Sequence, residues 1–549
     1  MPALDGHAFA AQVEAASLMR DLEQLARWQK LAGTPAEMES LRFVQDRMQA
    51  HGYRTELLLH NAYISLPGSA HVEIDGVALH GITHSMARAS PPGGATGPLV
   101  DVGEGAEADF TGHDLRGTIL LVEGIASPAV TLRAARAGAI GQLHISPHEH
   151  IHEMCISPVW GSPDPETAQD LPCTVVVSVA REDGLRLREK LGGGETPVVI
   201  LHAAVDTGWR KIPLLVASLD APDPQAPFIL FSGHHDTWYE GVMDNGAANA
   251  TMLEVARLAA PRRAAWRRGL RFCFWSGHSQ GRYAGSAWYA DTHWAELEDR
   301  CAVHVNVDST GGIGATVMGE ATTASSLSAF AGAVLAEELG VNHEGRRQAR
   351  NGNQSFWGIG VPGLYCSLSL QPPGPVRMRN PLGWWWHTPD DLLDKIDPEF
   401  LTRDTRVYAH AIWRLLTDPV LPFDHATPVT ALLAELRACA TPAAEGLGLD
   451  RLTGLVETLA ARLRDSAWPD AVALCVARAL VPLDYTTGDR FAHDPALPQP
   501  SWPVLEPLRR LAKAEVGSDA AHLLTVSGRR SCNRVEYAVR QAAAALAGS

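Results

Sequence analysis

The spacing of apolar residues predicts helices at both ends of the chain and a mixture of strands and helices between them. Near the N-terminus, from about residue 8 to 55, apolar side chains such as Leu18 and Leu22 recur at helical intervals. Thr34, the proline after it and Glu37 have the spacing of a capping box, which predicts the start of a helix there. From about residue 421 onward, alanine and leucine recur at the same period, so we expect a helical segment.

The pattern in the middle of the chain changes at about residue 210. From about 60 to 210, short runs predict a β-rich segment, and two of them, Thr118–Val122 and Gln142–Ile145, flank a helix-like run. From about 211 to 420, strand patterns alternate with helical ones, as in a mostly parallel sheet with helices on both faces. The chain is therefore predicted to be an α/β protein.

Residues with metal-ligand chemistry gather in the loop that follows the strand-like run Phe228–Phe231. This loop contains His234, Asp236 and Asp244 within thirteen residues, from Gly233 onward. Open α/β sheets bind their ligands beyond the carboxyl ends of the strands. Imidazole and carboxylate together suit a divalent cation such as Zn²⁺, so the loop predicts a metal site.

Two later segments complete a recognisable series. Val303–Ser309 is a buried-strand pattern that contains Asp308, and Trp384–Asp391 presents His387. With the first loop, these segments resemble the co-catalytic zinc aminopeptidase and carboxypeptidase family, which includes glutamate carboxypeptidase II, bacterial leucyl aminopeptidases and the non-catalytic transferrin receptor. The resemblance covers most of the chain.

The resemblance implies a role for each ligand candidate. His234 and Asp308 look like terminal ligands of one metal. Asp244 looks like the carboxylate that bridges two metals, and His387 like the terminal ligand of the second. Asp236 resembles the carboxylate that orients His234 from behind. Two metals about 3.5 to 4 Å apart can share a water and make it a nucleophile at neutral pH.

The chain departs from this family after the next strand, Leu270–Trp275. Catalytic members carry two adjacent glutamates there, a general base and a ligand of the second metal, and both are missing from residues 276–282. Counting along the loop, His278 takes the position of the base and Ser279 that of the ligand. His278 could serve as base, as a replacement ligand, or only as a hydrogen-bonding residue of a rebuilt loop. Glu240, in the first metal loop, is either another candidate base or a solvated carboxylate.

The resemblance also assigns the four segments. Residues 1–59 would be N-terminal helices that belong to a metallopeptidase-like catalytic domain at 211–420. Residues 60–210 look like the protease-associated domain inserted in larger members. Residues 421–549 resemble the helical domain that dimerises the carboxypeptidase and receptor members. A homodimer is one expectation, and a helical domain that packs only on its own catalytic domain is the other.

Composition limits the partners and the compartment. The net charge of −16 argues against binding to nucleic acid or to an anionic membrane. The N-terminus lacks a signal-peptide pattern, and no apolar run approaches the roughly 18 to 20 residues of a membrane span. The eight cysteines are scattered without a C-x-x-C pair, so we expect them to be reduced and buried, and the protein to be cytoplasmic.

The sequence as a whole predicts a hydrolase that uses one or two Zn²⁺ ions, or another divalent metal, to cleave a peptide or amide C–N bond in a small substrate. Three forms remain open. They are a two-metal hydrolase with His278 substituted into the site, a one-metal amide-processing hydrolase or lyase on His234, Asp244 and Asp308, and a non-catalytic binding or scaffold protein. Four of the five ligand positions persist, which favours an active enzyme, because loss of function usually erodes the ligands too.

Overall fold

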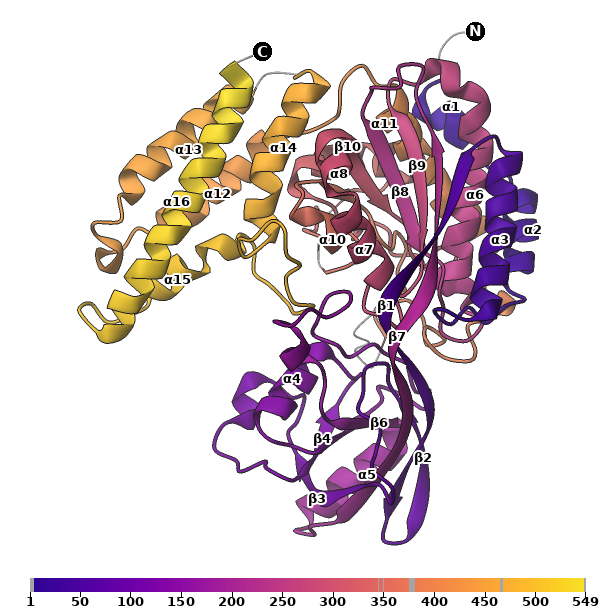
Figure 1. The fold of residues 1–549 in the computed structure, drawn as a ribbon, viewed down its shortest axis with the longest axis vertical. Coiled ribbons are helices and arrows are strands. Elements are labelled where there is room, and N and C mark those ends of the chain that lie inside the picture. The colour runs from indigo at the N-terminus through magenta and orange to yellow at the C-terminus, as the bar shows by residue number, and fades with distance from the viewer. Residues whose placement is uncertain (1–3, 344, 349, 375–380, 465–467, 548–549) are drawn as a thin grey trace.

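Two long antiparallel strands, β1 (Arg54–Ile74) and β7 (Val198–Leu219), run through both halves of the molecule and join them (Figure 1). They pair over almost their whole length, with a break in register between Pro67 and Ala70. At one end they belong to a helix-flanked sheet, and at the other to a β-rich lobe. The computed structural model describes every residue except 1–3, 344, 349, 375–380, 465–467 and 548–549.

The helix-flanked sheet continues beyond β7 into four further strands. In spatial order these are β9 (Gly269–Trp275), β8 (Phe228–His234), β10 (Cys301–Asn306) and β11 (Gly363–Leu364). All four are mutually parallel, whereas β7 is antiparallel to β9. The predicted mostly parallel sheet is confirmed, and the strands that lead to the candidate ligands lie side by side.

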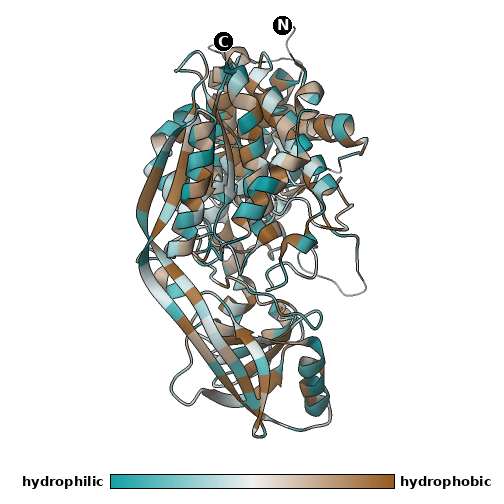
Figure 2. Ribbon diagram, turned by 90° about the vertical axis from the view of Figure 1, so that its right-hand side faces the viewer, coloured by the Kyte–Doolittle hydropathy of each residue, from teal (hydrophilic) through white to brown (hydrophobic). Residues whose placement is uncertain are grey.

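Alternate side chains of β8 enter two separate cores, one on each face of the sheet. Ile229 and Phe231 pack in the larger core, whereas Phe228 and Leu230 pack in the smaller one. Helices of the larger core are α1 (Gly6–Ala10), α2 (Ala15–Leu25), α3 (Pro35–Ala50), α6 (Ala248–Ala259), α9 (Ser328–Leu339) and α11 (Pro398–Thr417). Helices of the smaller core are α7 (Ala284–Thr292), α8 (Trp294–Arg300) and α10 (Gln354–Trp357). Figure 2 shows the apolar residues gathered on the enclosed strands, as expected for a sheet covered on both faces.

The start of α3 follows the predicted capping pattern with one difference. The Thr34 hydroxyl accepts from the backbone N–H of Glu37, and the proline stands at the first helical position. The Glu37 carboxylate accepts from the N–H of Gly33, at 2.7 Å, and not from that of Thr34. The helix therefore begins where predicted, and the glutamate fixes the residue before the cap.

The β-rich lobe is a closed ring of seven strands. From β1 it passes through β2 (Val77–Thr83), β6 (Val175–Val179), β5 (Gly141–Ile145), β4 (Ile119–Glu123) and β3 (Ala95–Asp101) to β7, which pairs again with β1. Alternate residues of these strands fill its interior, and α4 (Pro128–Arg136) and α5 (Arg181–Gly192) belong to the same lobe. The expected boundaries near residues 60 and 210 lie inside β1 and β7, so the lobe is a continuation of the sheet edge.

The C-terminal segment is a bundle of helices beside the sheet (Figure 1). Its helices are α12 (Ala426–Ala438), α13 (Leu449–Leu463), α14 (Asp470–Tyr485), α15 (Glu506–Ala512) and α16 (Asp519–Ala547). Two arginines link α14 to the part of the molecule that contains the helix-flanked sheet. Arg268 forms a bidentate ion pair with Asp470, and Arg478 donates to four backbone carbonyls, at residues 297, 298, 301 and 360.

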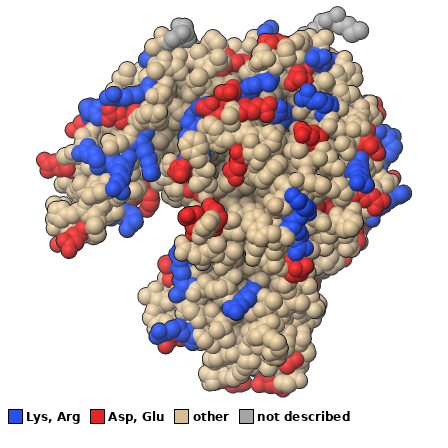
Figure 3. Space-filling view, in the orientation of Figure 1, with Lys and Arg blue, Asp and Glu red and all other residues tan. Residues whose placement is uncertain are grey.

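Lys and Arg side chains are interspersed with Asp and Glu on the face shown in Figure 3. Among the described residues, no helix has both the length and the apolar character needed to cross a bilayer. All eight cysteines are free, and five of them are buried. The expectation that all were buried is wrong for Cys173 and Cys475, which are exposed outside the packed cores, and Cys366 is only partly buried.

Candidate metal centre

The candidate ligands meet at the carboxyl edge of the sheet. His234 is the last residue of β8, and Asp308 follows the end of the neighbouring strand β10 by two residues. Asp244 lies in the irregular turn that leads into α6, and its peptide bond to Asn245 is cis. Parallel neighbouring strands end at the same edge, which explains how residues more than 60 positions apart come together.

The Asp244 carboxylate lies between two imidazoles. Its Oδ1 is 2.9 Å from Nε2 of His234, and its Oδ2 is 3.0 Å from Nε2 of His387. The carboxylate of Asp308 approaches the same His234 nitrogen, at 3.6 Å. One oxygen toward each histidine is the arrangement required of a carboxylate that bridges two metal positions.

The polar atoms at the centre fit a divalent metal. His234 Nε2 and Asp244 Oδ1 are buried, and neither forms an aligned hydrogen bond with any of the described residues despite their 2.9 Å separation. The other ring nitrogen of His234, Nδ1, is 2.7 Å from the backbone carbonyl oxygen of Asp236. Donation from Nδ1 to that carbonyl leaves the Nε2 lone pair facing the carboxylates, as a metal-binding histidine requires.

Asp236 does not contact His234 in the way that the resemblance implies. Its backbone carbonyl, not its carboxylate, contacts His234. The carboxylate accepts from the backbone N–H groups of His278 and Ser279, at 3.1 and 2.8 Å. Asp236 therefore fixes both the first ligand and the altered loop that replaces the glutamate pair.

His278 lies directly on the metal centre. Its ring stacks on that of His234, with centroids 3.9 Å apart and an interplanar angle of 11°. Ligand atoms of His234, His278 and Asp308 all lie within 4.8 Å of one another. Burial holds the pKa of His278 well below its usual value, so its imidazole is neutral. Around His387, the described residues form no comparable group of three.

Two further acidic residues, neither predicted from the sequence, hold the ligands in place. Asp391 accepts from the backbone N–H groups of Met243 and Asp244, at 2.8 and 3.0 Å, and burial raises its pKa to about 7. Glu153, from the β-rich lobe, accepts through its backbone carbonyl from His387 Nδ1, at 2.6 Å. Its own N–H donates to the His387 carbonyl, at 2.9 Å. The only local signal for Asp391 was its position in the run that presents His387.

The other candidate base, Glu240, points toward the N-terminal segment. Its carboxylate accepts from the side chain of Gln29, at 3.0 Å, and its carbonyl accepts from Lys30 Nζ, at 2.8 Å. It is not among the residues that line the cleft at the metal centre. Of the two base candidates, only His278 therefore lies at the ligands.

The centre opens into a cleft of about 490 Å³ between the helix-flanked sheet and the β-rich lobe. The lobe contributes Ile125, Met154 and Cys155, and the loops at the edge of the sheet contribute aromatic side chains such as Trp238 and Tyr283. Both parts of the molecule thus shape the space next to the ligands.

Positively charged arginine side chains line one part of the cleft, and the sequence had indicated only Arg282 among them. Arg282 and Arg350 both line the cleft. Nε of each, and Nη2 of Arg350, are buried without a hydrogen-bond partner in the part of the chain that the structure describes. Burial, together with the charge of Arg282, lowers the pKa of Arg350 to about 10. The two guanidinium groups therefore retain donors for an anion in the cleft.

The fold and the centre together define a metallopeptidase-like hydrolase. In comparison with known proteins, residues 215–412 match Peptidase family M28, which confirms the resemblance to co-catalytic zinc peptidases. A probable glutamate carboxypeptidase VP8 of Zea mays is 22% identical, over 81% of this chain and 72% of that protein. Aminopeptidase NAALADL1 of Rattus norvegicus is also 22% identical, over 42% of this chain and 41% of its own.

Solved structures show the same fold. An aminopeptidase from Aneurinibacillus sp. strain AM-1 has a TM-score of 0.57 and 21% identity, covering 76% of this chain and 98% of that one. A peptidase M28 precursor from Shewanella amazonensis has a TM-score of 0.61 and 20% identity, covering 76% and 96%. The chain thus spans these bacterial proteins almost completely but about two fifths of the rat relative.

Proposed function

We propose that the protein is a zinc-dependent hydrolase of the aminopeptidase or amidohydrolase type that cleaves a peptide or amide C–N bond in a small substrate. The family match and the curated relatives support metal-dependent peptide hydrolysis over a binding or scaffold role. The observation that carries the proposal is the Asp244 carboxylate between the Nε2 atoms of His234 and His387. When bound, the metal lowers the pKa of a water molecule and polarises the substrate carbonyl.

We further propose that one metal position binds its ion much more tightly than the other. His234, Asp244 and Asp308 converge on the first position, and the stacked ring of His278 is within reach as an added ligand. The second position keeps Asp244 and His387, but a serine stands where the second glutamate is expected. A neutral hydroxyl is a weaker ligand for Zn²⁺ than a carboxylate, so the second position should bind more weakly.

The cleft chemistry supports a substrate that carries a carboxylate. Arg282 and Arg350 line the same cleft as the metal ligands, and each has buried guanidinium N–H groups without a hydrogen-bond partner among the described residues. A guanidinium group matches a carboxylate with two parallel hydrogen bonds, which both binds and orients it. These arginines would hold the substrate while His234, Asp244 and Asp308 position the metal.

The remaining proposals concern the whole chain. The β-rich lobe lines the cleft and holds His387 through Glu153, which supports a role like that of the protease-associated domain in larger relatives. A homodimer through the helical C-terminal domain and a cytoplasmic location stay predictions from the sequence.

Zinc content per chain tests the proposal. The protein, His278→Ala and His387→Ala would be reconstituted with Zn²⁺, dialysed against a weak chelator and analysed for metal, with the exposed His522→Ala as the matched control. We expect His387→Ala and His522→Ala to hold as many ions tightly as the protein does, and His278→Ala to hold one of them at least tenfold more weakly. Loss of one ion in each of the two site variants would replace the one-metal form by the two-metal form. No retained ion in any of them would overturn the hydrolase.

A further inference from the structure

A second group of metal-ligand side chains lies on the β-rich lobe, away from the candidate catalytic ligands. His71 and Glu73 are two residues apart on β1, so they project from the same face of the strand. His202, on β7, is the direct cross-strand partner of His71. The neighbouring residues Val72 and Leu201 point the other way, into the core of the lobe. The register thus gathers two imidazoles and one carboxylate on the outer surface.

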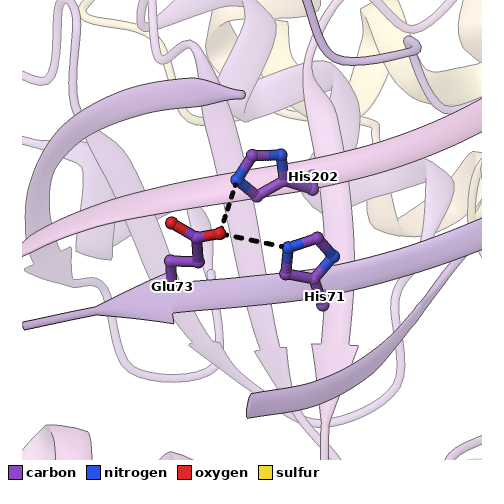
Figure 4. A group of neighbouring side chains, drawn as sticks. All are labelled: His71, Glu73 and His202. Carbon is purple, nitrogen blue, oxygen red and sulfur yellow. Dashed lines mark hydrogen bonds and ion pairs between the residues drawn. The ribbon is translucent and has the colours of Figure 1, made fainter. Parts of the chain in front are cut away.

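The three side chains face one another (Figure 4). Nε2 of His71 is 3.3 Å, and Nε2 of His202 is 3.4 Å, from the same Glu73 oxygen, Oε1. The two rings are stacked, with centroids 4.3 Å apart and an interplanar angle of 5°. One ligand atom from each residue lies within 4.8 Å of the other two. Small movements of these atoms toward a common point would bring all three to metal-bonding distance.

The contacts within the group leave ligand capacity unused. His202 Nε2 is buried and forms no aligned hydrogen bond with any described residue, because its 3.4 Å approach to Glu73 is not directed along an N–H bond. Gly94, in a left-handed conformation, packs against the His202 ring, and a Cβ there would lie 2.9 Å from Cε1. The backbone therefore confines the His202 ring, while the partly exposed His71 and Glu73 leave an open side toward solvent.

We propose that His71, Glu73 and His202 form a second divalent-metal site, of the Zn²⁺ type. Two imidazole nitrogens and one carboxylate oxygen are a ligand set that Zn²⁺ and neighbouring transition metals accept, with the remaining positions open to water or another ligand. The site exists only when β1 and β7 are paired in this register, so bound metal stabilises the strand pair that forms one wall of the lobe. It is separate from the proposed catalytic centre and does not depend on it.

The same row of the sheet offers a matched control. His80, on β2, is the cross-strand partner of His71 on its other side, but it does not belong to the three-residue group. His202→Ala and Glu73→Gln remove proposed ligands, whereas His80→Ala removes a neighbouring histidine from the same surface. All three residues lie on the outer face, so circular dichroism should show an unchanged fold for each variant.

The test is a Zn²⁺ titration of the metal-free full-length protein by isothermal calorimetry. We expect the protein and His80→Ala to bind one equivalent more than His202→Ala and Glu73→Gln, in addition to the catalytic equivalents that all four share. Zn²⁺ should also slow amide hydrogen exchange in residues 199–203 of the protein and not of His202→Ala. Equal stoichiometry in the protein and a folded His202→Ala, or loss of the extra equivalent in His80→Ala, would overturn the site. Either result would leave the catalytic equivalents, and thus the proposed function, intact.

Discussion

The ion pair between Arg268 and Asp470 should contribute strongly to the polar attachment of the helical domain. The Arg268 side chain is fully buried, and its Nε and Nη2 lie 2.7 and 2.8 Å from the two oxygens of Asp470. Nη1 donates to the carbonyls of Leu415 and Asp418, at 2.9 and 3.0 Å. The carboxylate of Asp470 is the charged partner of this buried guanidinium group, so its removal leaves a buried charge without compensation.

The expected cost follows from this burial. Breaking a buried pair by removal of one partner costs about 3 to 5 kcal/mol. The Asp470 side chain is 22% exposed, which admits some water and favours the lower end, about 3 kcal/mol for Asp470→Asn. Arg268→Met keeps much of the side-chain volume and removes the charge, so the double variant should recover part of the loss. We expect a coupling energy of about 2 kcal/mol between the two positions.

Urea unfolding followed by circular dichroism, with hydrogen exchange of α14 as a local readout, measures these quantities. The control is Glu457→Gln, which breaks the exposed contact between Arg437 and Glu457 in the same helical domain and should cost less than about 1 kcal/mol. A cost for Asp470→Asn equal to that of the control, or a coupling energy near zero, would refute the argument that burial gives the pair its strength.

Three further predictions concern the cleft, the metal ligands and the lobe. Arg350→Met should lower kcat/KM about 10- to 150-fold for a substrate with a carboxylate, because one charged hydrogen-bonding group is lost. The kcat/KM for the carboxamide analogue of that substrate should stay unchanged. An equal fall in kcat/KM for both compounds in steady-state kinetics would contradict this prediction. Asp391→Asn should weaken Zn²⁺ binding about 10- to 100-fold in a chelator competition, because the two backbone N–H groups donate to different carboxylate oxygens and one of these becomes an NH2 group in asparagine. The adjacent Asp390→Asn should bind Zn²⁺ normally. Burial lowers the pKa of His84 to about 3, so below about pH 6.5 the unfolded chain takes up a proton that the folded chain does not, and stability falls as the pH falls. The stability of the protein relative to His84→Gln should therefore drop by about 2 kcal/mol between pH 6.5 and 5, and a constant difference would show that His84 is not buried in its neutral form.

Local sequence patterns determined the elements and the order of the ligand candidates. The continuous apolar run Phe228–Phe231 predicts a strand buried on both faces, and the structure divides those side chains between two cores. The Thr34 cap predicts the start of α3 because capping depends on residues within one turn. The spacing of His234 and Asp244 likewise reflects one loop at one strand end.

Tertiary structure decided how those ligands are held and what surrounds them. Asp236 acts on His234 through its carbonyl, and Glu240 turns toward Gln29, because the path of each loop depends on segments packed against it. Glu153 reaches His387 across more than 230 residues, through a lobe that closes only when β1 pairs with β7. Side-chain types and their spacing can be read from a short stretch of sequence. The direction of a carboxylate or guanidinium group depends on contacts with residues far away in the chain, which no local pattern contains.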